Sequence, residues 1–316
     1  MRIILQFPEG LKQKAAQYVQ QYEKEGHEVF VASAPCYGAC DLCMDEARAI
    51  GAKKIVHVGH AEFMKMDVKG LEIEYIPYFD ELPEEILQNA VQKALGMLKG
   101  YEKIALVTTV QHIKQMNEVR KLLEDAGKKI LMEQGGKHVR HAGQILGCDS
   151  IAASKAASGA DCVLYFGGGQ FHPLGIRAVK PVLVADPYLG KAYWITEDIE
   201  KLEKKRKGAI LASAHAKSFG IIVSTKNGQF NLHGAMLAKK ELVKRGKKAM
   251  LLVSNEIFPL ALEDFNIFDA YVSTACPRIG DDHSLYKKPI IDFGDFGRML
   301  ELMDAVDGRR SAGKAL

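Results

Sequence analysis

Residues 3–32 read IILQFPEGLKQKAAQYVQQYEKEGHEVFVA, and this stretch decides the fold. An apolar run is followed by a polar turn, an amphipathic segment, a glycine and a second apolar run. Apolar runs without strict alternation indicate strands buried on both faces, and the segment between them has helical periodicity. A strand, a helix and a second strand in this order predict a right-handed crossover in a parallel sheet.

The same order returns twice, in residues 104–132 and 221–253. The distance from the first isoleucine to the glycine after the helix is 23, 23 and 25 residues in the three copies. Each copy continues into two more β-rich runs, such as AKKIVHVGHAEF and LEIEYIPYF in the first. The repeats predict an α/β protein of three similar parallel-sheet domains in a pseudo-three-fold triangular arrangement around a central metal site. We expect the domains to be 1–100, 101–208 and 209–316.

Composition narrows the class of protein. The chain has 316 residues, 47% of them hydrophobic and 26% charged, which is ordinary for a globular protein. A net charge of +4 is too small for a nucleic-acid-binding surface. No apolar run reaches the roughly 18 residues of a membrane span, and the N-terminal run is too short for a signal peptide. We therefore expect a cytoplasmic protein, whose six cysteines indicate metal or redox chemistry rather than disulfides.

Three cysteines follow strands of different repeats: Cys40 in YGACDL, Cys148 in ILGCDS and Cys276 in TACPRI. Ligands of open parallel sheets bind beyond the carboxyl ends of the strands, where these residues are expected. Their wide spacing is no obstacle, because loop-closure entropy grows by only about 0.6 kcal/mol per doubling of length. Iron–sulfur clusters accept thiolates from any distance along the chain. The pattern predicts a shared metal site.

A second pattern competes for one of these ligands. Cys36, Cys40 and Cys43 form Cys-x3-Cys-x2-Cys, the spacing by which ordinary radical S-adenosylmethionine enzymes bind a [4Fe-4S] cluster. Those enzymes usually have an aromatic residue where this chain has Leu42, and they place the motif in a (β/α) barrel. Cys162, inside the run ADCVLYF, is expected to be a small buried hydrophobe.

The segment FGGGQFHPLG, residues 166–175, is the best candidate for a cofactor cradle. Gly167, Gly168 and Gly169 follow a strand and would let the backbone N–H groups approach a carboxylate. His172 is placed to donate or accept a hydrogen bond in the same loop. The alternatives are a plain strand-to-loop turn and a structural histidine.

Three further side chains are candidates for contact with a cofactor. Arg278, two residues after Cys276, could clamp an amino-acid carboxylate, and a surface salt bridge is the alternative. Gln6 and Gln229 lie in corresponding turns after the first strands of their repeats. By analogy of the repeats both face the same end of the body, although simple turn hydrogen bonding also accounts for them.

The motifs PCYGACDL, GQILGC, FGGGQFHPLG and ACPRIGDD together resemble those of the archaeal diphthamide synthases, the 2-(3-amino-3-carboxypropyl)histidine synthases, over nearly the whole chain. The resemblance implies three α/β domains that each give one cysteine to a [4Fe-4S] cluster, with the fourth iron open to S-adenosyl-L-methionine. By motif, those ligands are Cys40, Cys148 and Cys276. Cys43 departs from the family pattern and creates the competing triplet.

The resemblance also implies the reaction, the first step of diphthamide biosynthesis. In that unusual branch of the radical S-adenosylmethionine enzymes, the reduced cluster cleaves the Cγ–S bond of the cofactor. The 3-amino-3-carboxypropyl group is transferred to a histidine of translation elongation factor 2, and methylthioadenosine is released. An electron donor and a homodimer are implied as well.

Three rival interpretations remain open at this point. A quinolinate synthase-like [4Fe-4S] lyase shares the three-domain plan and works without reduction of its cluster. A non-catalytic iron–sulfur scaffold or electron carrier has no use for an open iron. A conventional radical enzyme that uses Cys36, Cys40 and Cys43 would release 5′-deoxyadenosine.

Overall fold

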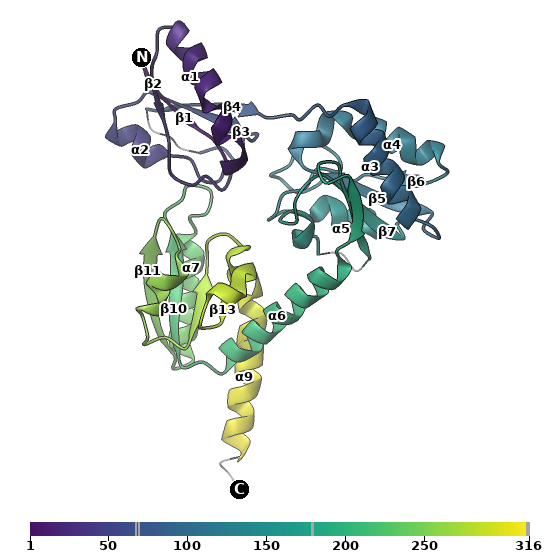
Figure 1. The fold of residues 1–316 in the computed structure, drawn as a ribbon. Coiled ribbons are helices and arrows are strands. Elements are labelled where there is room, and N and C mark those ends of the chain that lie inside the picture. The colour runs from purple at the N-terminus through teal and green to yellow at the C-terminus, as the bar shows by residue number, and fades with distance from the viewer. Residues whose placement is uncertain (67, 69, 178–179, 314–316) are drawn as a thin grey trace. The chain divides into compact units, whose positions relative to one another are not determined.

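The structure, a computed structural model, describes residues 1–66, 68, 70–177 and 180–313. Residues 314–316, the end of the third predicted domain, lie outside the described residues. The chain forms two compact units, Met1–Ile199 and Glu200–Leu316. The first unit contains two β-sheets and the second contains one (Figure 1).

The first sheet is formed by the N-terminal repeat. Its elements are β1 (Arg2–Gln6), η1 (Glu9–Lys14), α1 (Ala15–Lys24), β2 (Glu28–Val31), α2 (Met44–Ala49), β3 (Lys54–Gly59) and β4 (Glu72–Pro77). The strand order is β2-β1-β3-β4 and every pair is parallel. Ile3 and Leu5 pack with Tyr22 of α1, whereas Ile4 packs with Ala47 of α2. Strand β1 is therefore buried on both faces, as its unbroken apolar run predicts.

The second sheet has the order β6-β5-β7-β8-β9. Its elements are α3 (Glu84–Met97), β5 (Lys103–Thr108), η2 (Val110–Gln115), α4 (Met116–Asp125), β6 (Lys129–Leu131), α5 (Ile151–Ala157), β7 (Cys162–Phe166), η3 (Pro173–Gly175), β8 (Val182–Asp186) and β9 (Lys191–Trp194). Helix α6 (Thr196–Ala214) follows, and Ala209, Ile210 and Ala214 near its end pack in the core of the second unit. Strand β9 is antiparallel to β8, unlike the other pairs. The Asp186 carboxylate accepts hydrogen bonds from the amides of Tyr188 and Leu189, and Gly190 has φ 59°, so the chain reverses in a tight turn.

Helix α3 packs on the second sheet although it precedes it in the chain. Leu87, Ala94 and Leu98 lie in one core cluster with Ile104 and Leu106 of β5. This packing follows from the apolar face of α3 and the short connection to β5. The domain boundaries near residues 100 and 208 stay predictions, and α6 runs without a break through the second of them.

The third sheet has the order β11-β10-β12-β13 with parallel pairs throughout. Its elements are β10 (Ser218–Ser224), α7 (Leu232–Lys244), β11 (Lys248–Ser254), α8 (Pro259–Glu263), β12 (Ala270–Ser273), η4 (Ile279–Leu285), β13 (Ile290–Asp292), η5 (Phe293–Asp295) and α9 (Phe296–Gly313). Asn231 caps α7, because its side chain accepts a hydrogen bond from the Gly234 amide at 2.9 Å. The α/β fold class with three similar parallel sheets is thus confirmed.

In each sheet the first strand of the repeat lies between the second and the third. The crossovers on its two sides run in opposite directions, and in open α/β sheets ligands bind at the carboxyl end of the strands where the direction changes. The structure places residues 6, 108 and 224 at these three ends. Chemistry is therefore expected in the loops that follow them.

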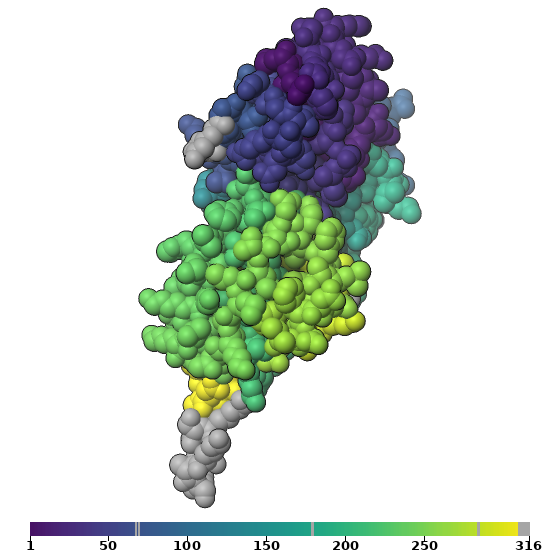
Figure 2. Space-filling view, turned by 90° about the vertical axis from the view of Figure 1, so that its left-hand side faces the viewer, coloured from purple at the N-terminus to yellow at the C-terminus, as the bar shows by residue number. Residues whose placement is uncertain are grey.

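Several large apolar side chains of the second unit are exposed. Helix α7 exposes Leu232, Met236 and Val243, and the edge strand β11 exposes Met250 and Val253. Figure 2 shows these green segments on the outside of that unit. In the described part of the chain, no helix has the length and apolarity that crossing a membrane requires.

Candidate functional site

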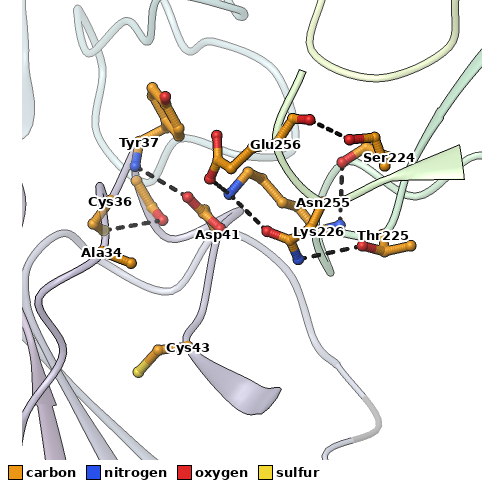
Figure 3. Close-up of polar contacts among 12 residues, drawn as sticks. Ala34, Cys36, Tyr37, Asp41, Cys43, Ser224, Thr225, Lys226, Asn255 and Glu256 are labelled. Carbon is orange, nitrogen blue, oxygen red and sulfur yellow. Dashed lines mark hydrogen bonds and ion pairs between the residues drawn. The ribbon is translucent and has the colours of Figure 1, made fainter. Parts of the chain in front are cut away.

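Cys40 lies in a turn between β2 and α2. The Asp41 amide donates to the Gly38 carbonyl at 2.9 Å, and the Asp41 carboxylate accepts from the Tyr37 amide at 3.3 Å (Figure 3). Gly38 has φ 144°, a backbone conformation that favours glycine. The turn leaves Cys40 partly exposed.

The two neighbouring cysteines of the local triplet are buried. Cys36 donates from Sγ to the Gly38 carbonyl at 3.8 Å, and Cys43 precedes α2. Burial, reinforced by the nearby Glu46, raises the pKa of Cys43 to about 12, so its thiol stays protonated near neutral pH. Of the local triplet, only Cys40 is accessible to a cluster.

Cys148 lies at the tip of a tight turn and is exposed. The backbone groups of Leu146 and Asp149 exchange two hydrogen bonds, at 2.9 and 3.2 Å, around it. The loop before the turn is held against the carboxyl end of β5, because Ile145 donates to the Thr108 carbonyl at 2.8 Å. The exposed thiol is therefore carried on a well-anchored backbone.

Cys276 follows β12 and is partly exposed. The Thr274 amide and hydroxyl both donate to the Ile222 carbonyl, at 3.0 and 2.9 Å, which ties the loop to β10. The Cys276 carbonyl accepts from the Ile279 amide at 3.2 Å, where η4 begins. Cys40 and Cys148 belong to the first unit and Cys276 to the second. The described residues include no preassembled group of three or more His, Cys, Asp or Glu side chains able to hold a metal ion.

The glycine loop after β7 is closely packed by tyrosines. A β-carbon at Gly167 would lie 2.9 Å from the Tyr165 hydroxyl, and one at Gly168 would lie 2.6 Å from the Tyr188 ring. A β-carbon at Gly169, which has φ 74°, would meet no other atom within 4 Å. Protein packing thus accounts for two of the three glycines, and only Gly169 leaves room for an approaching ligand.

The second half of this loop lies beside the Cys148 turn. The Phe171 ring occupies the space that a side chain at Gly147 would fill. His172 is half-buried, and its ring meets Phe171 edge-to-face with the centroids 5.3 Å apart. Two of the predicted segments, the glycine loop and the LGC motif, are therefore brought together.

Gln6 is buried and joins β1 to the Cys40 turn. Its Nε2 donates to the Asp41 carbonyl at 2.7 Å, and its Oε1 accepts from the Cys43 amide at 3.3 Å and faces His57 Nδ1 at 2.9 Å. His57 Nε2 lies 3.0 Å from His60 Nδ1. Sequence reasoning missed this histidine pair, although the run HVGH at the end of a predicted strand was a usable signal.

Arg278 is buried in an ion-pair network rather than on the surface. Its guanidinium pairs with Asp281, whose other oxygen accepts from Arg206 Nε at 2.8 Å. Glu203 pairs with the opposite side of Arg206. Arg278 thus lies beside Cys276 as expected, with Asp281 holding it in place.

Gln229 is half-buried in the loop after β10, where its backbone N–H donates to the Lys226 carbonyl at 3.0 Å. Lys226 itself is only 6% exposed, and its Nζ pairs with Glu256 at 2.6 Å (Figure 3). A buried lysine is rare unless it is paired, and the pairing was not predicted because its partner lies 30 residues away.

A family model for diphthamide synthesis proteins matches residues 7–308. The 2-(3-amino-3-carboxypropyl)histidine synthase of Pyrococcus horikoshii is 36% identical over 294 residues, which cover 92% of this chain and 83% of the relative. The enzyme of the same name from Methanocaldococcus jannaschii is 31% identical, and the match covers 95% of this chain and 84% of the relative. Subunit 1 of the Saccharomyces cerevisiae enzyme is 30% identical, and the match covers 92% of this chain and 68% of the relative.

The crystal structure of Dph2 from Pyrococcus horikoshii with a 4Fe-4S cluster is similar over 95% of this chain and 86% of that one, with a TM-score of 0.82 and 35% identity. A second crystal structure of the same protein matches equally well. The family model and these relatives agree over nearly the whole length. The chain therefore belongs to the family of diphthamide synthesis proteins.

Proposed function

We propose that this protein is a radical S-adenosylmethionine-dependent 3-amino-3-carboxypropyltransferase. It transfers that group to a histidine of translation elongation factor 2, the first step of diphthamide biosynthesis. The relatives' shared name, 2-(3-amino-3-carboxypropyl)histidine synthase, supports the product. The observation that carries the proposal is the contrast among the six cysteines: Cys40, Cys148 and Cys276 are accessible, and the other three are buried.

These three residues fit a [4Fe-4S] cluster as ligands. Each thiol stands on a loop beyond the carboxyl end of a different sheet, held by backbone hydrogen bonds. Three thiolates leave one iron of such a cluster without a protein ligand, which matches the proposed use of S-adenosylmethionine. A pseudo-three-fold arrangement around the cluster is part of the proposal.

The bound cluster would supply the electron that opens the carbon–sulfur bond of the sulfonium. The net reaction converts S-adenosylmethionine and histidine into the substituted histidine, methylthioadenosine and a proton. The chain's own contribution is to hold and orient the reactants. Gly169 offers open backbone that an approaching ligand can reach.

An electron donor, a cytoplasmic location and a homodimer complete the proposal. Leu232, Met236 and Val243, which helical spacing places on one exposed face of α7, support the dimer, because clustered exposed apolar side chains often mark an interaction surface.

The test uses the full chain loaded anaerobically with iron and sulfide, reduced with dithionite and mixed with S-adenosylmethionine and archaeal elongation factor 2. We expect methylthioadenosine and one modified histidine in equal amounts. Release of 5′-deoxyadenosine would favour a conventional radical enzyme, and turnover without reductant would favour a lyase. A cluster whose spectrum ignores S-adenosylmethionine would favour an electron carrier.

A further inference from the structure

The buried side chains of Gln6 and His57 form a hydrogen-bonded chain that ends at His60. It lies at the carboxyl ends of β1 and β3. His57 is fully buried, whereas His60 is half-buried and so can reach a ligand. The elements that face the pair contribute Tyr75, whose ring lies 5.8 Å from that of His57.

The hydrogen bonds determine which nitrogen carries each proton. Gln6 Nε2 donates to a carbonyl and Gln6 Oε1 accepts from an amide, so the side-chain amide has one orientation. His57 Nδ1 faces that oxygen and must donate. In neutral His57, Nε2 is then the acceptor, so the facing His60 Nδ1 must donate to it. Neutral His60 is left with a bare lone pair on Nε2.

His60 Nε2 lies close to the Cys40 turn. A β-carbon placed on Gly38 would lie 3.8 Å from His60 Nε2 and 3.9 Å from Cys40 Sγ. Both atoms therefore border the same small space, which Gly38 leaves open. Burial lowers the pKa of both rings, which agrees with two neutral histidines.

We propose that His60 Nε2 accepts a hydrogen bond from a donor group of bound S-adenosylmethionine, beside Cys40, and that His57 and Gln6 act as positioning residues that hold the proton on His60 Nδ1. This inference rests on the proposed function. The cofactor offers two kinds of donor, its ammonium group and its ribose hydroxyls. A neutral acceptor suits either of them.

The first experiment needs no cluster. Nitrogen NMR of metal-free protein with ¹⁵N-labelled histidine reports which ring nitrogen is protonated. We expect a protonated Nδ1 and a bare Nε2 at His60, and mixed tautomers in His57→Leu. In His57→Gln the amide can replace both hydrogen bonds, so the wild-type tautomer should return. A protonated Nε2 in the wild type would overturn the inference.

The second experiment measures S-adenosylmethionine binding to unreduced, cluster-loaded protein by equilibrium dialysis, alongside iron content. His60→Phe should weaken binding by about ten- to a hundredfold if the donor is the ammonium group, and by about three- to tenfold if it is a ribose hydroxyl, with iron retained in either case. His215→Phe, at an exposed histidine of the second unit, is the matched control and should bind normally.

Analogues identify the donor. If the ammonium group is the partner of His60, an analogue without it will bind the wild type and His60→Phe equally. If a ribose hydroxyl is the partner, a deoxyribose analogue will bind the two proteins equally. Unchanged affinity in His60→Phe, or loss of its iron, would overturn the inference and leave the proposed function standing. Wild-type protein that holds iron yet does not bind S-adenosylmethionine would contradict the proposed function, and the inference would fall with it.

Discussion

The first and third sheets share one strand order but carry different chemistry at the same end. In the first, the neutral side chains Gln6, His57 and His60 are linked by hydrogen bonds. In the third, the buried groups are charged and paired, as in Arg278 with Asp281. The repeat therefore determines where functional groups gather, and each copy's own residues determine whether that place presents a lone pair or a fixed charge.

The largest effect is expected from breaking the charged network. Asp281→Ala removes the carboxylate shared by Arg206 and Arg278, and loss of one partner from a buried ion pair costs about 3–5 kcal/mol. Urea denaturation of the full chain measures this cost, and replacing Arg206, Arg278 and Asp281 together by apolar residues of similar size should recover most of it. A loss below about 1 kcal/mol would show that the network behaves as a surface contact.

A smaller effect is expected from breaking the neutral chain. His57→Leu leaves hydrogen-bonding atoms of Gln6 and His60 without their present partner, at a cost of about 1–3 kcal/mol. Hydrogen exchange of β1 and β3, followed by mass spectrometry, should show the change in the first sheet. Equal protection in the variant and the wild type would mean that the chain of hydrogen bonds does not stabilise the fold.

The two regions should also respond differently to acid. Burial lowers the pKa of His57 to about 3 and of His60 to about 4, while unfolded histidine titrates near pH ~6.5. Below that pH the unfolded chain binds more protons, so the free energy of unfolding of the first sheet falls as the pH drops from about 6.5 towards 4.

The third sheet should keep its stability to a lower pH. The amides of Lys217 and Ser218 donate to Asp269 and hold its pKa below the ordinary 3.8, so its contribution is complete above that pH and is lost as the pH falls further. Hydrogen-exchange protection factors, corrected for intrinsic exchange, should fall in β3 and stay constant in β12 between pH 7 and 5. Earlier loss in β12 would reverse the comparison.

The smallest effect is expected at the surface of the third sheet. Arg245 pairs with Asp304 at 2.8 Å and with Glu241 at 2.6 Å, but all three side chains are in contact with solvent and the Asp304 carboxylate is half-exposed. Arg245→Ala should therefore cost only about 0.5 kcal/mol, and less in high salt. A cost comparable to that of Asp281→Ala would show that exposure does not separate the two kinds of ion pair.

Much of this fold follows from local patterns in the sequence. Three apolar runs with helices between them gave the parallel sheets, and the buried environment of Cys162 followed from its place in ADCVLYF. The hairpin to β9 could not be predicted from such patterns, because it depends on the side chain of Asp186, which closes a turn. Nor could the packing of α3, which belongs to the sheet that follows it.

The site was harder to predict, because its contacts join distant parts of the chain. Gln6 meets His57 across 51 positions, and no periodic pattern encodes that meeting. The role suggested for Gly167 and Gly168 could not be separated from packing until Tyr165 and Tyr188 were seen against them. The ligand roles of Cys40, Cys148 and Cys276 stay predictions.

The most direct test of the account is the iron content and low-temperature EPR of the dithionite-reduced protein, for the wild type and single Cys→Ala variants at all six positions. The account predicts that the [4Fe-4S] signal is lost in Cys40→Ala, Cys148→Ala and Cys276→Ala and kept in the variants of the buried cysteines. Loss at Cys36, Cys40 and Cys43, with Cys148 and Cys276 tolerant of substitution, would contradict it.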